Sequence, residues 1–204
     1  MKKLGLIVAM EIEARLIIER LNLNSIDNDN KIYIKDDKYG EYSSIVLIIS
    51  GIGMENSAIS AQTLALVYNV DTILNFGYVG SNLLKIGTIV SPNLVFNYDF
   101  DLTTMGYEKY KVPGTENLVL NNVNNHYICE CYSSNHFVTE SNEENPTIYD
   151  MELHGIAMAC SKNNISLSSI KIVTDSLNVD MYNKNEVDIN FTKILSNAVL
   201  KHLN

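Results

Sequence analysis

The 204-residue sequence has little of three features that would assign it to a special class of protein. No apolar run approaches the ~20 residues needed to span a bilayer, so no membrane-spanning segment is expected. Cysteine is scarce: the three residues are an odd number, and Cys129 and Cys131 lack the spacing of a zinc site. We therefore expect reduced thiols in a cytoplasmic protein.

Positive charge is also scarce. The chain has 15 Lys and Arg residues against 24 Asp and Glu, a formal net charge of −9. Phosphate binding needs clustered Lys and Arg, so neither nucleic acid nor an anionic membrane is expected as a partner. No metal or cofactor is expected either, because the histidines are scattered without metal-ligand spacing. They are His126, His136, His154 and His202.

What the chain does have is an alternation of strand-like and helix-like segments. Residues 4–9 form a continuous apolar run that predicts a buried strand rather than a signal peptide. Apolar residues then recur at helical spacing over 11–23. Further strands are expected at 44–49, 70–76 and 170–174, and helices at 54–68, 152–162 and 191–203. This alternation predicts a single α/β domain over residues 1–204 with a largely parallel sheet.

Acidic residues follow three of the expected strands. Glu13 comes after the first strand and Asp175 ends the strand at 170–174. Asp150 and Glu152 stand at a strand-to-helix junction, where they would also suit the dipole of a first helical turn. Each acid alone is explained by a helix dipole or a turn cap. Together at the carboxyl ends of strands they indicate a ligand site.

Glycines gather at two other strand ends. Gly51 and Gly53 precede a helix, but Asn56 stands where a dinucleotide fingerprint needs a third glycine. The pair therefore predicts a tight turn or a close approach of backbone to ligand. Residues 97–114 form a long irregular stretch, and loops of this length are usually functional or form an interface.

Six motifs occur in a fixed order. They are Ala9-Met10-Glu11-x-Glu13, Ser50-Gly51-Ile52-Gly53, Asn75-x-Gly77-x-x-Gly80, Gly106-Tyr107-Glu108 followed by Pro113-Gly114, Asp150-Met151-Glu152, and Thr174-Asp175. From Lys3 to the C-terminal helix the chain thereby resembles the 5′-methylthioadenosine/S-adenosylhomocysteine nucleosidases, within the purine nucleoside phosphorylase superfamily. The resemblance implies a three-layer sandwich with a central mixed, mostly parallel sheet flanked by helices. It also implies hydrolysis of adenine nucleosides such as these two, releasing adenine, in methionine salvage.

The resemblance implies roles for the acids. Glu13 aligns with the acid that activates the attacking water. Glu152, beside Met151 on the sugar face, aligns with the acid that binds the ribose hydroxyls. Asp175 aligns with the acid that protonates or hydrogen-bonds purine N7.

The resemblance also implies the remaining contacts with a small-molecule purine nucleoside. Phe137 aligns with the aromatic that stacks on the base, and Val138 with its neighbour that offers backbone contacts. Tyr107 aligns with a residue that family members lend to a neighbouring subunit, which implies a homodimer with this region at the interface. Further implied contacts are Ala9, Met10, Ile52 and Tyr78.

Elementary chemistry requires the same groups. An N-glycosidic bond breaks through an oxocarbenium-like sugar while negative charge builds on the departing purine. The reaction needs a base for water, an acid at the leaving group, and carboxylates that hold the sugar. To act as the acid, Asp175 must carry a proton, so we expect burial to raise its pKa.

Two alternatives remain open at the level of sequence. A phosphorylase needs a cationic phosphate pocket, for which arginine is suited. Arg15 and Arg20 both lie in the first expected helix, so water is the expected nucleophile, although a lysine would also supply the charge. The other alternative is a nucleoside-binding protein that has lost turnover, because Tyr78 stands where the family usually has a small Ser.

Overall fold

The computed structural model describes residues 2–115, 118–186 and 188–204. The strands are β1 (Lys2–Val8), β2 (Asn24–Asp27), β3 (Ile32–Lys35), β4 (Tyr42–Ile49), β5 (Thr72–Ser81), β6 (Ile89–Asn97), β7 (Leu118–Val119), β8 (Tyr127–Ser133), β9 (Thr147–Asp150) and β10 (Ser166–Asp175). The helices are α1 (Glu11–Leu21), α2 (Met54–Leu66), α3 (Leu153–Asn163), α4 (Val179–Glu186) and α5 (Ile189–Leu203), with a 3₁₀ turn at Thr103–Met105.

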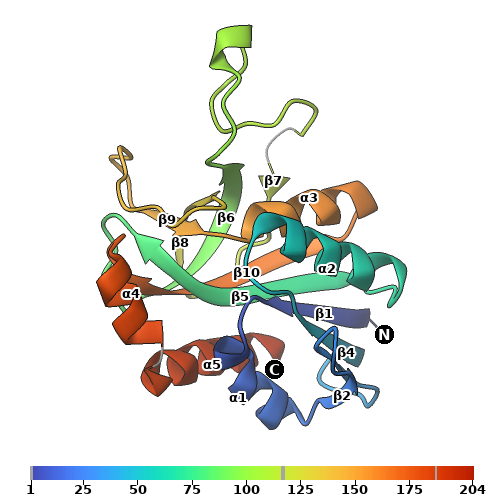
Figure 1. Cartoon of the computed structure of the whole chain (residues 1–204). Coiled ribbons are helices and arrows are strands. Elements are labelled where there is room, and N and C mark those ends of the chain that lie inside the picture. The colour runs from blue at the N-terminus through green and yellow to red at the C-terminus, as the bar shows by residue number, and fades with distance from the viewer. Residues whose placement is uncertain (1, 116–117, 187) are drawn as a thin grey trace.

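Across these described ranges the strands form one mixed sheet in the order β10-β6-β8-β9-β5-β1-β4-β3-β2, with β7 beside β6. Its longest pairings are parallel: β5 with β10, β1 with β4, and β6 with β8. Helices α2 and α3 cover one face, and α1 and α5 cover the other (Figure 1). The predicted three-layer α/β arrangement is confirmed.

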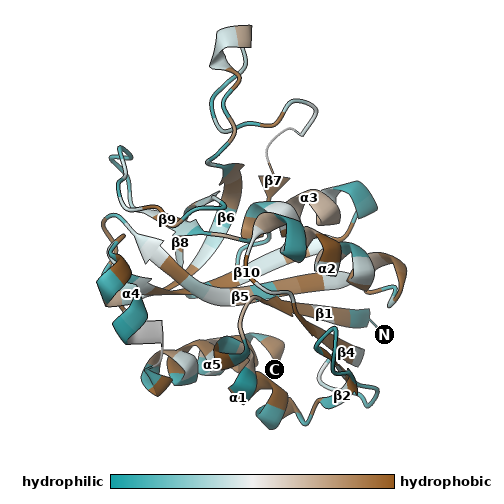
Figure 2. Ribbon diagram, in the orientation of Figure 1, coloured by the Kyte–Doolittle hydropathy of each residue, from teal (hydrophilic) through white to brown (hydrophobic). Residues whose placement is uncertain are grey.

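Beside a small cluster around Tyr132 and Tyr149, the hydrophobic core has two large clusters, one on each face of the sheet. Strand β1 contributes to both, because Leu6 packs toward α1 and α5 while Ile7 packs toward α2. Alternate side chains of a strand point to opposite faces, so a strand covered on both sides must be apolar throughout. The hydropathy colouring shows β1 and β4 hydrophobic along most of their length (Figure 2).

A glycine brings the starts of α2 and α3 together. A Cβ on Gly155 would lie 2.1 Å from the carbonyl oxygen of Met54, so no larger residue fits without separating the helices. Ser57 on α2 donates a hydrogen bond to the Glu152 carbonyl at 2.9 Å. The predicted turn before α2 is also confirmed, with positive φ at Gly51 and Gly53.

One expectation about local structure is wrong, and some elements were not predicted. Asp150 ends β9 and Glu152 precedes α3, so neither acid lies in a first helical turn; Asp150 pairs with Ser133 of β8 instead. Helix α4 was not predicted. Strand β2 lies in a stretch that reads as polar turns, because pairing with β3 overrides its low strand propensity.

Residues 98–115 form an arm that projects from the body of the molecule beyond β6 (Figure 1). The arm contains the 3₁₀ turn. Its aromatic residues Tyr98 and Tyr110 stack with ring centroids 4.9 Å apart. No helix in the described ranges has the length and apolar character needed to cross a membrane.

Candidate active site

A cavity of about 300 Å³ opens at the ends of β1, β5, β9 and β10. All but one of the site residues predicted from the sequence line it. They are Ala9, Met10, Glu13, Ile52, Tyr78, Phe137, Val138, Met151, Glu152 and Asp175. The structure therefore brings together acids that lie up to 162 positions apart in the chain, from Glu13 to Asp175.

Tyr107 is the exception. It lies on the arm, is 47% exposed, and lines a separate surface hollow with Lys111 and Pro113. Within one copy of the chain it does not reach the cavity.

Two backbone amides hold the Glu13 carboxylate. The N–H of Tyr78 donates to Oε1 at 2.7 Å, and the N–H of Met10 donates to Oε2 at 2.9 Å. The second bond is that of an N3 acid capping its own helix, here α1. Glu13 is 3% exposed, and burial raises its pKa from 4.5 to about 7 against the opposing effect of the Tyr78 amide.

Two glycines of β5 make room for the carboxylates. A Cβ at Gly77 would lie 3.0 Å from Glu13 Oε1, and a Cβ at Gly80 would lie 2.8 Å from Asp175 Oδ1. Both acids therefore lie directly against the strand backbone. The Gly-x-x-Gly spacing is explained by this close approach.

Glu152 sits between the starts of α2 and α3. Its Oε1 accepts a hydrogen bond from the N–H of Gly53 at 3.1 Å, and its Oε2 accepts one from the N–H of Met151 at 3.3 Å. Burial, and next the charge of Asp150, raise the pKa of Glu152 to about 7. Lys171 opposes that rise.

A buried ion pair supports the acids from behind. The Nζ of Lys171 lies 2.9 Å from Asp150 Oδ2, and both side chains are almost fully buried. Burial disfavours the charge on Lys171, but Asp150 and Glu152 outweigh burial and raise its pKa above the usual value. Ser133 donates to the other oxygen of Asp150 at 2.5 Å. Sequence reasoning missed Lys171, because a lysine within a strand gives no local sign of burial.

Asp175 occupies the other end of the cavity. Its Oδ1 accepts hydrogen bonds from the N–H groups of Leu177 and Asn178 at 2.9 and 3.3 Å. The Thr174 hydroxyl donates to Oδ2 at 3.1 Å. Burial outweighs these bonds and raises the pKa of Asp175, the direction predicted for a proton donor.

Tyr78 does not extend its hydroxyl toward Glu13. The phenol oxygen lies 2.8 Å from Thr192 Oγ1 on α5, and the Tyr78 side chain is buried in the cluster on that face of the sheet. Tyr78 still lines the cavity. A tyrosine at this position therefore need not occupy the space beside the Glu13 carboxylate.

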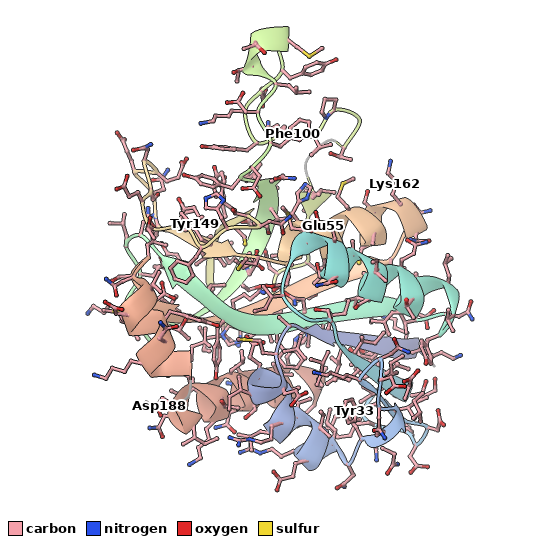
Figure 3. The ribbon with its side chains drawn as sticks, viewed as in Figure 1. Tyr33, Glu55, Phe100, Tyr149, Lys162 and Asp188 are labelled. Atoms are coloured by element: carbon pink, nitrogen blue, oxygen red, sulfur yellow. The ribbon has the colours of Figure 1, made fainter. Side chains whose placement is uncertain are left out.

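Sequence reasoning also missed Tyr182 and Tyr149. Tyr182 on α4 packs against Phe137 with ring centroids 5.6 Å apart, and its hydroxyl donates to the sulfur of Met10 at 3.5 Å. Tyr149, labelled in Figure 3, lines the cavity. Its ring contacts that of Tyr98, at the base of the arm, edge to face with centroids 5.6 Å apart. Spacing along the sequence carried no signal for either contact.

The site contains carboxylates but no metal cluster. Among the residues that the structure describes, no group of three His, Cys, Asp or Glu side chains is arranged to hold a metal ion. Cys129, Cys131 and Cys160 are buried free thiols. The carboxyl groups of Glu13, Glu152 and Asp175 in the cavity support proton transfer and hydrogen bonding.

Comparison with known proteins supplies the family. The family model of the phosphorylase superfamily matches residues 3–202. The chain belongs to this superfamily. It is 31% identical over 217 aligned residues to the 5′-methylthioadenosine/S-adenosylhomocysteine nucleosidase of Buchnera aphidicola subsp. Acyrthosiphon pisum, covering 92% of this chain and 91% of that protein. The resemblance found in the motifs is thereby confirmed.

Two solved structures of this superfamily have the same fold. S-adenosylhomocysteine nucleosidase from Streptococcus pyogenes, in complex with 5-methylthiotubericidin, superposes with a TM-score of 0.87 over 99% of this chain and 96% of that chain. The 5′-methylthioadenosine/S-adenosylhomocysteine nucleosidase of S. pneumoniae, with the inhibitor MT-ImmA, gives 0.85 over 98% of both chains. Because the sequence identities are only 20% and 21%, these two matches show a shared fold and nothing more.

Proposed function

We propose that the protein hydrolyses the N-glycosidic bond of adenine nucleosides such as 5′-methylthioadenosine and S-adenosylhomocysteine, releasing adenine. The observation that carries the proposal is the meeting of Glu13, Glu152 and Asp175 in one cavity of about 300 Å³. The 31% identity to a nucleosidase over 92% of the chain supports it.

Glu13 is the proposed base. Both of its oxygens are held by backbone N–H groups, so the carboxylate has a fixed position. A pKa of about 7 suits a group that must take a proton from water near neutral pH. Water bound beside Glu13 would attack the anomeric carbon as the bond to the purine breaks.

Glu152 and Asp175 are proposed to hold the two halves of the substrate. Glu152, held by the Gly53 and Met151 amides, would accept hydrogen bonds from the ribose hydroxyls and stabilise positive charge developing on the sugar. Asp175, with its raised pKa, would give a proton or a hydrogen bond to purine N7. Phe137 would stack on the base between these two acids.

The surroundings of the cavity favour water over phosphate. Lys171, the cation behind the cavity, already pairs with Asp150, and a phosphate there would face the carboxylates of Glu13 and Glu152. Arg15 and Arg20 are exposed on α1, where Arg20 donates to the Asn197 side chain. Neither lines the cavity.

The deciding experiment measures adenine release from methylthioadenosine in phosphate-free buffer and again with phosphate. We expect equal rates and free thioribose in both buffers. Glu13→Gln should lower kcat at least about 100-fold, the usual contribution of a general base. Glu11→Gln is the matched control, because Glu11 lies on the same helix but is exposed and pairs with Lys31. Release that requires phosphate, or a Glu13→Gln variant as active as Glu11→Gln, would refute the proposal.

We also propose that the protein is a homodimer. Tyr107 and Met105 are exposed on the arm, 47% and 68%, and lie outside the cavity of their own chain. A second copy would cover these side chains and would allow Tyr107 to complete its neighbour's site. Light scattering of the purified protein tests this, since a monomer at micromolar concentration would rule it out.

The setting of the activity is part of the same proposal. We place the protein in the cytoplasm as a single domain that takes part in methionine salvage. Its buried free thiols suit a reducing compartment. Fractionation of the source cells tests the location. Finding the protein in the membrane or exported fraction would exclude the cytoplasm.

A further inference from the structure

Two hydrogen bonds of Tyr78 point in different directions. Its backbone N–H donates to Glu13 Oε1 at 2.7 Å, while its side-chain hydroxyl lies 2.8 Å from the Thr192 hydroxyl on α5. Tyr78 in β5 therefore connects the proposed base on α1 to α5, the other helix on the same face of the sheet.

Thr192 lies outside the cavity. Its side chain is fully buried on α5, which packs against β10 and α1, and it does not line the site. Burying two hydroxyl groups costs free energy unless each finds a partner. The Tyr78–Thr192 bond satisfies this requirement and fixes how far the Tyr78 ring extends toward α5.

Strand pairing alone holds the backbone at Tyr78 only in part. Tyr78 pairs with Ile172 of β10, and Val79 pairs with Val173. The register then shifts between Val173 and Asp175, so the regular ladder is interrupted one residue beyond Tyr78. Side-chain anchoring therefore contributes to the position of the Tyr78 amide where the strand pairing becomes irregular.

We propose that Thr192 is a positioning residue for Glu13 and acts through Tyr78. The hydrogen bond between the two hydroxyl groups fixes the position of the Tyr78 ring. The ring in turn fixes the backbone of β5 at Tyr78, and the backbone N–H of Tyr78 fixes the position of Glu13 Oε1. The inference rests on the proposed function, in which Glu13 activates water.

The proposal predicts a pH-dependent effect. Among the hydrogen bonds to Glu13, that of the Tyr78 amide lowers its pKa most, so weakening this bond raises the pKa. Glu152 and Lys171 also act on Glu13, in opposite directions, and are unchanged by substitutions on α5. Further titratable groups at or behind the cavity are Asp150, Asp175, His136, Tyr149 and Tyr182.

Thr192→Val tests the proposal, because it removes the hydroxyl and keeps the shape. A rise of about one pH unit in the pKa of Glu13 lowers the ionised fraction about tenfold at pH 6 and hardly at pH 9. We therefore expect kcat to fall about three- to tenfold at pH 6, to change less than about twofold at pH 9, and KM to stay unchanged. Tyr78→Phe should behave alike, and the double variant should be no worse than either single one.

Two further variants on α5 separate positioning from stability. Thr192→Ser keeps the hydroxyl and should keep the wild-type pH profile. Ser196→Ala removes an equally buried hydroxyl of the same helix, one that donates to the Lys193 carbonyl at 3.0 Å. Ser196→Ala should lower the stability of the protein but leave the pH profile of kcat unchanged. A loss in Thr192→Val that is the same at pH 6 and pH 9 would overturn the proposal.

A second readout does not need turnover. Carbon-13 NMR of glutamate-labelled protein reports the pKa of the Glu13 carboxyl in the free protein, with its signal assigned by Glu13→Gln. Thr192→Val should raise this pKa, and Ser196→Ala should not. An unchanged pKa of Glu13 in Thr192→Val would refute the positioning role of Thr192, whether or not the protein releases adenine. The test of this role is therefore independent of the test of the proposed hydrolysis.

Discussion

The buried carboxyl of Glu13 should make the protein less stable as the pH rises, and Glu13→Gln should remove that penalty. The pKa is about 7 in the folded protein and 4.5 for an ordinary glutamate. Between these values the folded state binds more protons than the unfolded state, so the free energy of unfolding falls with pH. The stabilisation is complete below about pH 4.5 and is lost by about pH 7 to 8.

The size of the effect follows from the same interval. At 1.36 kcal/mol per pH unit, ionising Glu13 in the folded protein costs about 3 kcal/mol. Gln resembles the protonated carboxyl, with one acceptor oxygen and one donor group, so the variant and the wild type should have similar stability at pH 4.5. By pH 8 the variant should be more stable by up to about 3 kcal/mol.

Urea unfolding at pH 4.5, 6 and 8 measures the difference at each pH. Glu11→Gln is again the control, because Glu11 lies in the same first turn of α1 and is exposed. For this control we expect a difference that barely depends on pH. If the Glu13→Gln difference is equally flat, the carboxyl is not held at a raised pKa, and the argument from burial is wrong.

Two more substitutions probe the groups around the acids. Lys171→Met leaves Asp150 buried without its partner and should cost about 3–5 kcal/mol of unfolding free energy, whereas Lys85→Met, at an exposed lysine, should cost little. Gly80→Ala places a Cβ 2.8 Å from Asp175 Oδ1 and should lower kcat about tenfold or more by displacing that acid. Gly5→Ala creates an equally close contact with a leucine in the core, so it should lower stability while kcat is kept.

Part of the site was predictable because its signals are local. Glu13 and Asp175 each follow an apolar run, and parallel strands bring their carboxyl ends to one edge of a sheet. The glycines at 77 and 80 mark the same strand end. The six motifs, read in order, were enough to name the family. The role of each acid remains a proposal.

Other features depend on contacts between distant residues and left no trace in local sequence. Whether Tyr78 would fill the cavity could not be decided until α5 was placed, since its hydroxyl bonds a residue 114 positions away. The helix that carries Tyr182 was missed because its sequence is short and mostly polar. The same limit applies to Tyr107, whose proposed place in a site depends on a second chain.

The sequence by itself determined the α/β pattern, the strand ends that carry acids and the superfamily, because periodicity and motif order are properties of neighbouring residues. The tertiary structure decided which amide holds each carboxylate, that Lys171 lies buried beside Asp150, and that Tyr78 turns toward α5. The physical reason is that burial and hydrogen bonding set the charge state and position of a side chain, and both arise only when distant segments pack together.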